Sequence, residues 1–563
     1  MDTQERLLRQ LPGLNPEEQV EVIIKYHGSL ANIAQSLSAE AEELNENYAI
    51  IVIPVYKLPQ LLTINEVEFY ELPKTLTFQL RRSLNLTGVT NVQQERGYNL
   101  NGAGVLVGII DSGIDYTHPD FRTSDGKTRI LYMWDQNAEG SPPHGFISGH
   151  LYTKEDIDLA LTSDDPAAVV PEVDNLGHGT AVAGVAAGNG RSSNGEDSGV
   201  APQAGIVVVK LKEDVEPGFA RSTAIMRGVK FCIDMAVGLE MPIAINISYG
   251  TNDGAHNGTS LFEGYLDSAS TRWKTVICVA AGNERSAGHH YYGVIAQNAT
   301  QSIEYSIGEN IRQLYLTFWK NFADTFEIEL ISPSGQSSGV ISAVNRATRV
   351  VLDNVRVTVL FGMPTHYNFS QEIYITMEGI GGPMRPEIWR LTVKGIIIVD
   401  GRINIWLPMT DMVTEKTAFL VPNPENTLSI PATAFSVISV GGYSGIQNTC
   451  AFFSGRGLPY IVYGQKPDLI APGDTVLTTS VGGGYDTFTG TSIAAPFVTG
   501  AAALMMEWGI VRQNDVFLFG QKVKAFLCRN ANRTFPVSYP NSSWGYGLLD
   551  LIATMDNLIL YRE

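Results

Sequence analysis

Short apolar runs that each stop at a polar or small residue are the feature that most constrains the fold of this chain. Residues 105–111 (VLVGIID) end in Asp111, and residues 276–283 (VICVAAGN) end in Asn283. Runs of this length without polar alternation are typical of parallel strands covered on both faces. The sequence therefore predicts an α/β fold, a parallel sheet with helices on both faces. Ligands bind outside the carboxyl ends of such strands, where Asp111 and Asn283 would lie.

Small residues surround two further motifs, which we expect to open helices. Residues 177–180 (GHGT) precede one small-residue segment, and residues 490–496 (GTSIAAP) begin another. Ser492 would lie at the N-terminal end of the second helix, where the helix dipole favours negative charge. Its apolar segment, residues 493–506, is interrupted by Pro496 and Gly500 and is too short to span a bilayer. We expect a core helix there and no membrane partner.

Asp111, His178 and Ser492 are the three groups that an activated serine nucleophile requires. The imidazole takes the hydroxyl proton, and the carboxylate holds the imidazole tautomer and stabilises its positive charge. Their order along the chain, Asp, His, Ser, is that of subtilisin and differs from the orders of trypsin-like enzymes and α/β-hydrolases. The Asn283 amide would donate to a developing oxyanion together with the Ser492 backbone N–H. Taken singly, Asp111 is also explained as a turn cap and Ser492 as a helix N-cap.

Four segments together resemble the signature segments of the subtilase family, in the family's order. They are DSGID (111–115), GHGTAVAG (177–184), AAGN (280–283) and GTSIAAP (490–496). The resemblance implies a subtilisin-like serine endopeptidase that works through an acyl-enzyme. It implies catalytic roles for Asp111, His178 and Ser492, and an oxyanion-hole role for Asn283.

The same resemblance implies where a substrate would bind. Residues 243–250 (IAINISYG) match the strand whose end borders the pocket for the residue before the scissile bond. Ser248, Tyr249 and Gly250 would pair with the substrate backbone as an added strand. The opposite wall would be Ala280, Ala281 and Gly282. The alternative is a buried parallel strand that ends in a turn.

Length, charge and cysteine content bound the number of domains and argue against several other classes of function. The chain has 563 residues, too many for one core, and about three domains are expected. Its net charge is −19, from 39 basic and 58 acidic residues, and no Lys/Arg cluster suggests a nucleic-acid partner. The four cysteines are widely spaced, so we expect neither a disulfide framework nor a CxxC metal site. No cofactor is expected, and no metal is assigned.

The segment before Asp111 has a compact α/β pattern. Strands are expected at 20–26, 49–55 and 67–72, a helix at 29–44 and a short helix at 58–62, which suits a ferredoxin-like unit. Subtilases are commonly made with such a prodomain, which assists folding and leaves its tail in the cleft. The alternative is an unrelated accessory α/β module.

A second domain interrupts the catalytic sequence, because Asn283 and Ser492 are 209 residues apart. Between about 302 and 407 the sequence is rich in Val, Ile, Tyr, Phe and Trp with Gly and Pro turns, which predicts an inserted β-sandwich or jelly roll. The expected domains are the prodomain at 1–82, the catalytic domain in two parts at 83–300 and 431–563, and the insertion at 301–430.

Further motifs give a closer resemblance to the Csp germination proteases of clostridia and related Firmicutes. They are GYNL (97–100), HPDF (118–121), WDQ (134–136) and KPDLIAPG (466–473). In those proteins the prodomain is cut yet stays bound as an inhibitor, and active members convert the precursor of a spore-cortex lytic enzyme. Some members have lost triad residues and act as signalling pseudoproteases, which leaves a non-enzymatic role as an alternative. A glycan-binding role for the β-sandwich is a third.

The remaining predictions concern the two ends of the prodomain, namely a secretory signal and self-processing. The N-terminus lacks the basic and apolar regions of a secretory signal, so cytoplasmic synthesis is expected, with spore association or non-classical export as open routes. Residues 72–92 follow the last predicted strand and would reach the active site. We expect self-processing there, at a bond between Thr77 and Leu84, and an intramolecular cut because a tethered substrate has a high effective concentration.

Overall fold

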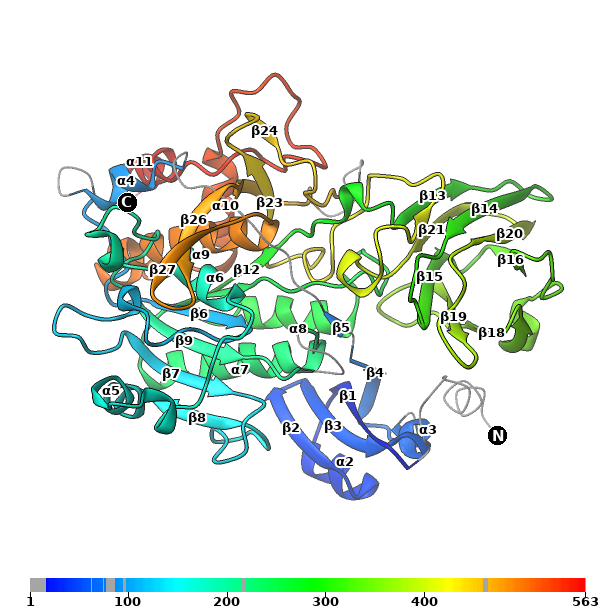
Figure 1. Ribbon diagram of the computed structural model, residues 1–563, viewed down its shortest axis with the longest axis horizontal. Coiled ribbons are helices and arrows are strands. Elements are labelled where there is room, and N and C mark those ends of the chain that lie inside the picture. The colour runs from blue at the N-terminus through cyan, green and yellow to red at the C-terminus, as the bar shows by residue number, and fades with distance from the viewer. Residues whose placement is uncertain are drawn as a thin grey trace. The chain divides into compact units, whose positions relative to one another are not determined.

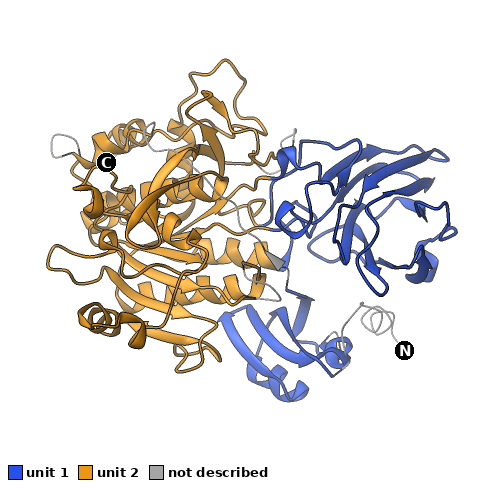
Figure 2. Ribbon diagram, in the orientation of Figure 1, with its two compact units in different colours: residues 1–74, 251–261, 284–430 blue, residues 75–250, 262–283, 431–563 orange. Residues whose placement is uncertain are grey.

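The computed structural model describes residues 17–61, 63–73, 75–76, 87–94, 98–213, 218–458 and 464–561. These residues form two compact units, which Figure 2 draws in different colours. The first unit comprises residues 1–74, 251–261 and 284–430, and the second comprises residues 75–250, 262–283 and 431–563. Each unit thus contains segments that are far apart in the sequence.

The second unit is built on a mostly parallel sheet (Figure 1). The sheet order is β24-β23-β12-β11-β6-β9-β7-β8, and β25 pairs with β23. All pairs are parallel except β7 with β8 and β23 with β24. The strands are β6 (Leu106–Asp111), β7 (Ile130–Asp135), β8 (His150–Thr153), β9 (Gly205–Lys210), β11 (Ile243–Ile247), β12 (Thr275–Ala280), β23 (Ile438–Ser444), β24 (Thr449–Cys450) and β25 (Leu469–Asp474). The predicted α/β class is confirmed.

Helices cover both faces of this sheet. On one face, α6 (His178–Ala187) and α9 (Thr491–Met506) share a core with Val107 and Ile109 of β6. On the other face, α7 (Ser222–Gly238) comes close to the strands, since Cys232 lies against Gly108 and Ile110 lies against Gly228. The other helices are α4 (Val89–Gln93), α5 (Lys154–Thr162), α8 (Leu261–Ser270), α10 (Gly520–Asn530) and α11 (Leu551–Leu560).

The segment beginning at Ser492 is a core helix. The expectation that it is too short to span a bilayer is wrong, because the helical stretch runs from Thr491 to Val511 and, among the described residues, is the one helix long and apolar enough to cross a membrane. Its apolar window is nevertheless entirely buried. Small residues make this burial possible, because a side chain at Gly500 would overlap Val200 and the Ala186 carbonyl. Close packing of α9 therefore fixes the position of its first turn.

The N-terminal part of the first unit has the expected ferredoxin-like order. Its elements are β1 (Gln19–Tyr26), α2 (Leu30–Leu37), β2 (Glu40–Asn45), β3 (Tyr48–Pro54), α3 (Leu58–Leu61) and β4 (Val67–Glu71), and the antiparallel sheet runs β2-β3-β1-β4. The predicted helix at 29–44 is wrong in its second half. It ends at Leu37 because Ser38 is left-handed, with φ 48°, and residues 40–45 pair with β3.

The insertion, together with the residues from His290 that precede it, is a β-sandwich of two antiparallel sheets with one apolar core. One sheet runs β13-β21-β15-β19-β18-β17 and the other β16-β20-β14-β22. Burial alternates along the strands, as in Leu314, Leu316 and Phe318 of β15, which face the shared core. The strands are β13 (His290–Val294), β14 (Thr300–Ser306), β15 (Gln313–Asn321), β16 (Thr325–Ile331), β17 (Ala347–Leu352), β18 (Val355–Phe361), β19 (Ser370–Gly379), β20 (Ile388–Ile397), β21 (Arg402–Trp406) and β22 (Ala418–Phe419).

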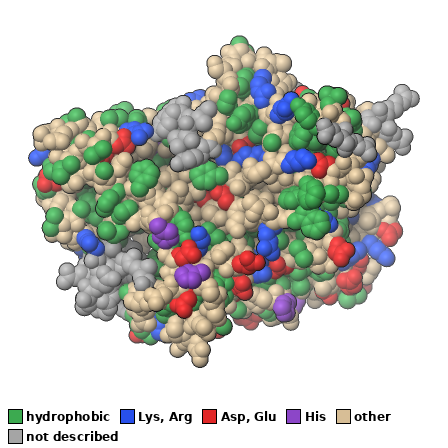
Figure 3. Space-filling view, turned by 180° about the vertical axis from the view of Figure 1, so that it is seen from behind, with side chains coloured by type: hydrophobic (Ala, Val, Ile, Leu, Met, Phe, Trp, Pro, Cys, Tyr) green, Lys and Arg blue, Asp and Glu red, His purple; other side chains and the backbone are tan. Residues whose placement is uncertain are grey.

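Charged side chains of both signs are interspersed on the face drawn in Figure 3. Lys and Arg lie among Asp and Glu there. The expectation that nucleic acid is not a partner stays a prediction from composition.

Candidate active site

Asp111 and His178 form a buried pair at the carboxyl edge of the parallel sheet. Asp111 is the last residue of β6, and His178 is the first residue of α6. The His178 Nδ1 lies 2.6 Å from Asp111 Oδ1, and both side chains are fully buried. Asp111 Oδ1 also accepts the Ser112 backbone N–H at 2.8 Å. A carboxylate at Nδ1 keeps the proton on that nitrogen, which leaves Nε2 to act as the acceptor.

Ser492 occupies the first turn of α9, and α9 packs beside α6. Its hydroxyl is buried and makes no hydrogen bond within the described residues. Its backbone is fixed, because the Ser248 hydroxyl donates to the Ser492 carbonyl at 2.9 Å. Asn246 of β11 supports that contact by donating to Ser248 Oγ at 2.8 Å, and Thr499 of α9 donates to Asn246 at 3.0 Å. The helix start is thus tied to β11.

The Asn283 side chain has a defined orientation. Its Oδ1 accepts from the Thr491 backbone N–H at 3.1 Å and from the Thr491 hydroxyl at 3.2 Å. The Thr491 hydroxyl itself accepts the Gly282 N–H at 3.0 Å. Because Oδ1 is occupied, the Nδ2 amide is the group left to donate, next to the turn that carries Ser492. An oxyanion-hole role for Asn283 stays a prediction from the sequence.

Asp174 is a residue of this site that the sequence analysis missed. Its Oδ1 accepts from Ser112 Oγ at 2.8 Å and from Gly177 N–H at 3.0 Å, and its Oδ2 accepts from Thr180 N–H at 2.9 Å and Oγ1 at 2.6 Å. These bonds join the end of β6 to the first turn of α6. An acidic residue just before a helix is a known N-terminal signal, and the sequence carries it at this position.

The segment after Asp111 passes very close to the start of α6. A Cβ atom at Gly179 would overlap the Gly113 carbonyl oxygen. The Gly179 N–H instead donates to Ser112 Oγ at 2.9 Å. Only glycine allows this approach, which explains the Gly on the C-terminal side of His178.

Two buried ionisable side chains of the second unit have raised pKa values, and one of them, Tyr249, lies beside His178. The Tyr249 ring meets the His178 ring edge-on, with centroids 6.5 Å apart. Burial, and the charges of Asp111 and Asp174, raise the pKa of Tyr249 well above its usual value, so it stays neutral. Glu172 is also buried, and its desolvation raises the pKa of its carboxyl to about 8, although Lys210 at 3.4 Å opposes this.

The six residues expected to contact substrate lie at the carboxyl ends of two adjacent strands. β11 and β12 pair in parallel, and the segments that follow them carry Ser248, Tyr249, Gly250, Ala281 and Gly282, with Ala280 ending β12. All six are buried, and the Ser248 hydroxyl is already used on Ser492. Any pairing of this edge with a substrate would therefore use backbone groups.

The short strand at the start of the second unit pairs within that unit. β5 (Thr75–Leu76) runs antiparallel to β10 (Ala220–Arg221), with Leu76 opposite Ala220 and Thr75 opposite Arg221. β10 leads directly into α7. The bond expected to be cut, between Thr77 and Leu84, lies outside the described residues.

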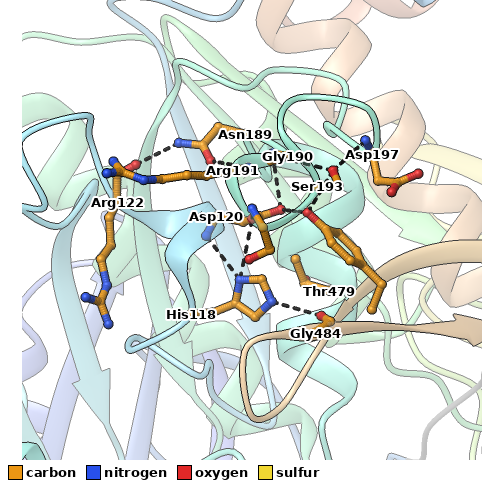
Figure 4. Close-up of polar contacts among 12 residues, drawn as sticks. His118, Asp120, Arg122, Asn189, Gly190, Arg191, Ser193, Asp197, Thr479 and Gly484 are labelled. Carbon is orange, nitrogen blue, oxygen red and sulfur yellow. Dashed lines mark hydrogen bonds and ion pairs between the residues drawn. The ribbon is translucent and has the colours of Figure 1, made fainter.

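Asp120 of the HPDF motif joins its own segment to those around Gly190 and Gly484 (Figure 4). Its Oδ1 accepts from Ser192 N–H at 2.8 Å, and its Oδ2 accepts from Gly190 N–H at 3.1 Å and the Tyr485 hydroxyl at 2.7 Å. The ring of His118 bonds the Asp120 N–H and the Gly484 carbonyl. The carboxylate is thus satisfied by N–H and O–H donors. Among the described residues no group of three or more His, Cys, Asp or Glu could hold a metal ion.

Comparisons with known proteins agree with this architecture. The chain matches the model of the subtilase family over residues 102–351 and 420–547, and the Csp protease B prodomain model over residues 2–74. The solved structure of the Clostridium perfringens CspB protease is 39% identical, with a TM-score of 0.79, and the match covers 84% of this chain and 96% of that one.

Curated relatives are more distant and much longer. The PIII-type proteinase of Lactococcus lactis subsp. cremoris is 22% identical over 520 residues, which cover 81% of this chain and 25% of that protein. The C5a peptidase of Streptococcus pyogenes is 24% identical over 442 residues, which cover 74% of this chain and 36% of that protein. The chain therefore spans about a quarter to a third of the length of these relatives.

Proposed function

Because the chain belongs to the subtilase family of serine proteases, we propose that it is an endopeptidase that hydrolyses peptide bonds through an acyl-enzyme. The observation that carries the proposal is the buried 2.6 Å contact between His178 and Asp111. Ser492 Oγ attacks the scissile carbonyl while His178 Nε2 takes its proton, and Asp111 stabilises the imidazolium that forms. His178 then gives the proton to the leaving amine, and a water molecule repeats the sequence on the acyl-enzyme.

The developing negative charge on the carbonyl oxygen needs donors that are already oriented. Asn283 Nδ2 and the Ser492 backbone N–H fill this role in the proposal. Support comes from the two hydrogen bonds that Asn283 Oδ1 accepts from Thr491, which tie the side-chain amide to the residue before Ser492. The helix N-terminus at Ser492 adds a favourable dipole.

Self-processing is the second part of the proposal. The antiparallel pairing of β5 with β10 supports it, since a polypeptide that binds a protease cleft commonly does so as an added strand. The chain continues from Leu76 toward the bond expected to be cut.

Contacts inside the first unit favour retention of the cut prodomain as an inhibitor. The Tyr367 hydroxyl of the insertion donates to Glu68 Oε2 at 3.0 Å, and Lys25 lies 4.6 Å from the centroid of the Tyr367 ring. Phe69 packs edge-on against Tyr367, with centroids 5.9 Å apart. These contacts would remain after the connecting segment is cut.

The physiological substrate is proposed from the Csp resemblance. It would be a precursor protein, such as a spore-cortex lytic enzyme, made in the same cell. Cytoplasmic synthesis followed by spore association or non-classical export is the corresponding location.

A signalling or binding protein without turnover is the second candidate. The specific observation in its favour is the Ser492 hydroxyl, which makes no hydrogen bond within the described residues. A fluorophosphonate probe separates the two candidates. Labelling that is present in wild type and lost in Ser492→Ala supports the protease. Absence of labelling in wild type, after its prodomain has been removed, supports the second candidate.

A further inference from the structure

A buried carboxylate directly follows the proposed oxyanion residue. Glu284 is the next residue after Asn283, and it is only 3% exposed. Its Oε2 lies 2.6 Å from His289 Nδ1 and 3.4 Å from Asn252 Nδ2. Its Oε1 accepts from Thr410 N–H at 3.3 Å and from Thr410 Oγ1 at 3.0 Å. Both oxygens are thus used inside the first unit.

The partners of Glu284 come from three separate segments of that unit. Asn252 lies two residues after Gly250, and its amide also donates to the Leu407 carbonyl at 3.1 Å. The second ring nitrogen of His289 lies 2.9 Å from the Thr417 carbonyl. Leu407 and Thr417 flank Thr410 in the segment that follows β21 of the β-sandwich. Glu284 therefore joins the insertion to the residues that follow Asn283 and Gly250.

The contact between Glu284 and His289 requires an acid at position 284. A carbonyl only accepts, so His289 Nε2 must carry a proton toward Thr417. The other ring nitrogen then shares one further proton with the Glu284 carboxyl. Glutamine has a single acceptor oxygen, so it cannot serve His289, Asn252 and Thr410 together. A buried donor left without a partner costs about 1–3 kcal/mol.

We propose that Glu284 is a positioning residue for the oxyanion hole, through which the β-sandwich fixes the backbone of Asn283. The inference rests on the proposed protease function. Thr491 holds the Asn283 side chain, and the Glu284 network fixes the residue that directly follows Asn283. Loosening the Glu284 network would leave substrate binding unchanged but would misalign the Asn283 Nδ2 donor. Misplacements of this kind cost up to about 100-fold in rate.

The test is a double-mutant cycle between Glu284→Gln and Asn283→Ala, measured as kcat and KM on a peptide substrate with the full-length protein. In the wild-type background Glu284→Gln should lower kcat about 10- to 100-fold with little change in KM. In the Asn283→Ala background it should have little further effect, because the donor it positions is gone. An unchanged kcat in the single variant, or an equal loss in both backgrounds, would overturn the proposal.

Two controls separate this role from general damage to the fold. Asp324→Asn is the matched control, because Asp324 also accepts several N–H groups inside the β-sandwich, from Val399, Asp400 and Gly401, without a link to Asn283. It should leave kcat unchanged. If Glu284→Gln does not fold, the cycle is repeated with Thr410→Val in its place. This variant removes only the hydroxyl that donates to Glu284. Failure of wild type itself to turn over substrate would refute the protease function. If wild type is active and Glu284→Gln leaves kcat unchanged, only the positioning role is refuted.

Discussion

Asp174 illustrates, at the scale of single residues, how groups outside the reaction fix those proposed to react. Its four hydrogen bonds come from Ser112, Gly177 and Thr180, and they join the strand that ends in Asp111 to the helix that begins at His178. Such a carboxylate, buried among N–H and O–H donors, is costly to replace, because each lost acceptor leaves a donor unpaired. The geometry of the pair therefore depends on residues that have no chemical role.

Asn283→Ala tests the oxyanion donor alone. Removing one donor aimed at the tetrahedral intermediate should lower kcat by about 10²- to 10³-fold while KM changes little. Steady-state kinetics on a peptide substrate provide the measurement. A rise in KM with kcat untouched would assign Asn283 to substrate binding or structure instead.

Glu172→Gln tests a pH dependence. The folded-state pKa of Glu172 is about 8, above its usual 4.5, because burial disfavours the charged form. The folded state therefore binds the proton more tightly, so this contribution to stability is complete below pH 4.5 and is lost as pH rises through 8. Wild type should lose more Tm than Glu172→Gln between about pH 5 and 9. Parallel Tm profiles for the two proteins would contradict the buried, protonated carboxyl.

At the scale of elements, the close contact between α6 and the end of β6 gives a sharp test. Gly179→Ala would place a methyl group against the Gly113 carbonyl and push the helix start away from Asp111, so kcat should fall by up to about 100-fold. Gly238→Ala is the matched control, because Gly238 lies in helix α7 and a methyl group there would meet nothing within 4 Å. Equal kcat values for the two variants would show that the contact tolerates displacement.

The strand ends of the site could be predicted from sequence, whereas several contacts between segments could not. Asp111 and Asn283 end apolar runs, and burial on both faces leaves a clear pattern in such runs. Asp174 and Glu284 were missed because their partners lie in remote segments, such as Ser112 and Thr410.

The error in the prodomain helix has a local cause. Residues 40–45 carry apolar side chains that fit a helical period, but Glu42 and Leu44 are the buried positions of an alternating strand. Pairing with β3 decided between the two structures, and that pairing is tertiary information.

At the scale of the whole molecule, the predicted prodomain is divided between the two units. Its folded part belongs to the first unit, and its last described strand, β5, pairs within the second. The sequence around Thr75 and Leu76 does not predict this pairing, because a strand of two residues has no detectable periodicity.

Self-processing tests this arrangement of the full chain. Wild type and Ser492→Ala are expressed side by side, and their N-termini are read by sequencing or mass spectrometry. Wild type should be cut between Thr77 and Leu84, and Ser492→Ala should remain intact. The rate of cutting should not change with protein concentration, because a tethered substrate reaches the active site without diffusional encounter. Identical full-length chains in both proteins would refute self-processing, and a rate that rises with concentration would show that one molecule cuts another.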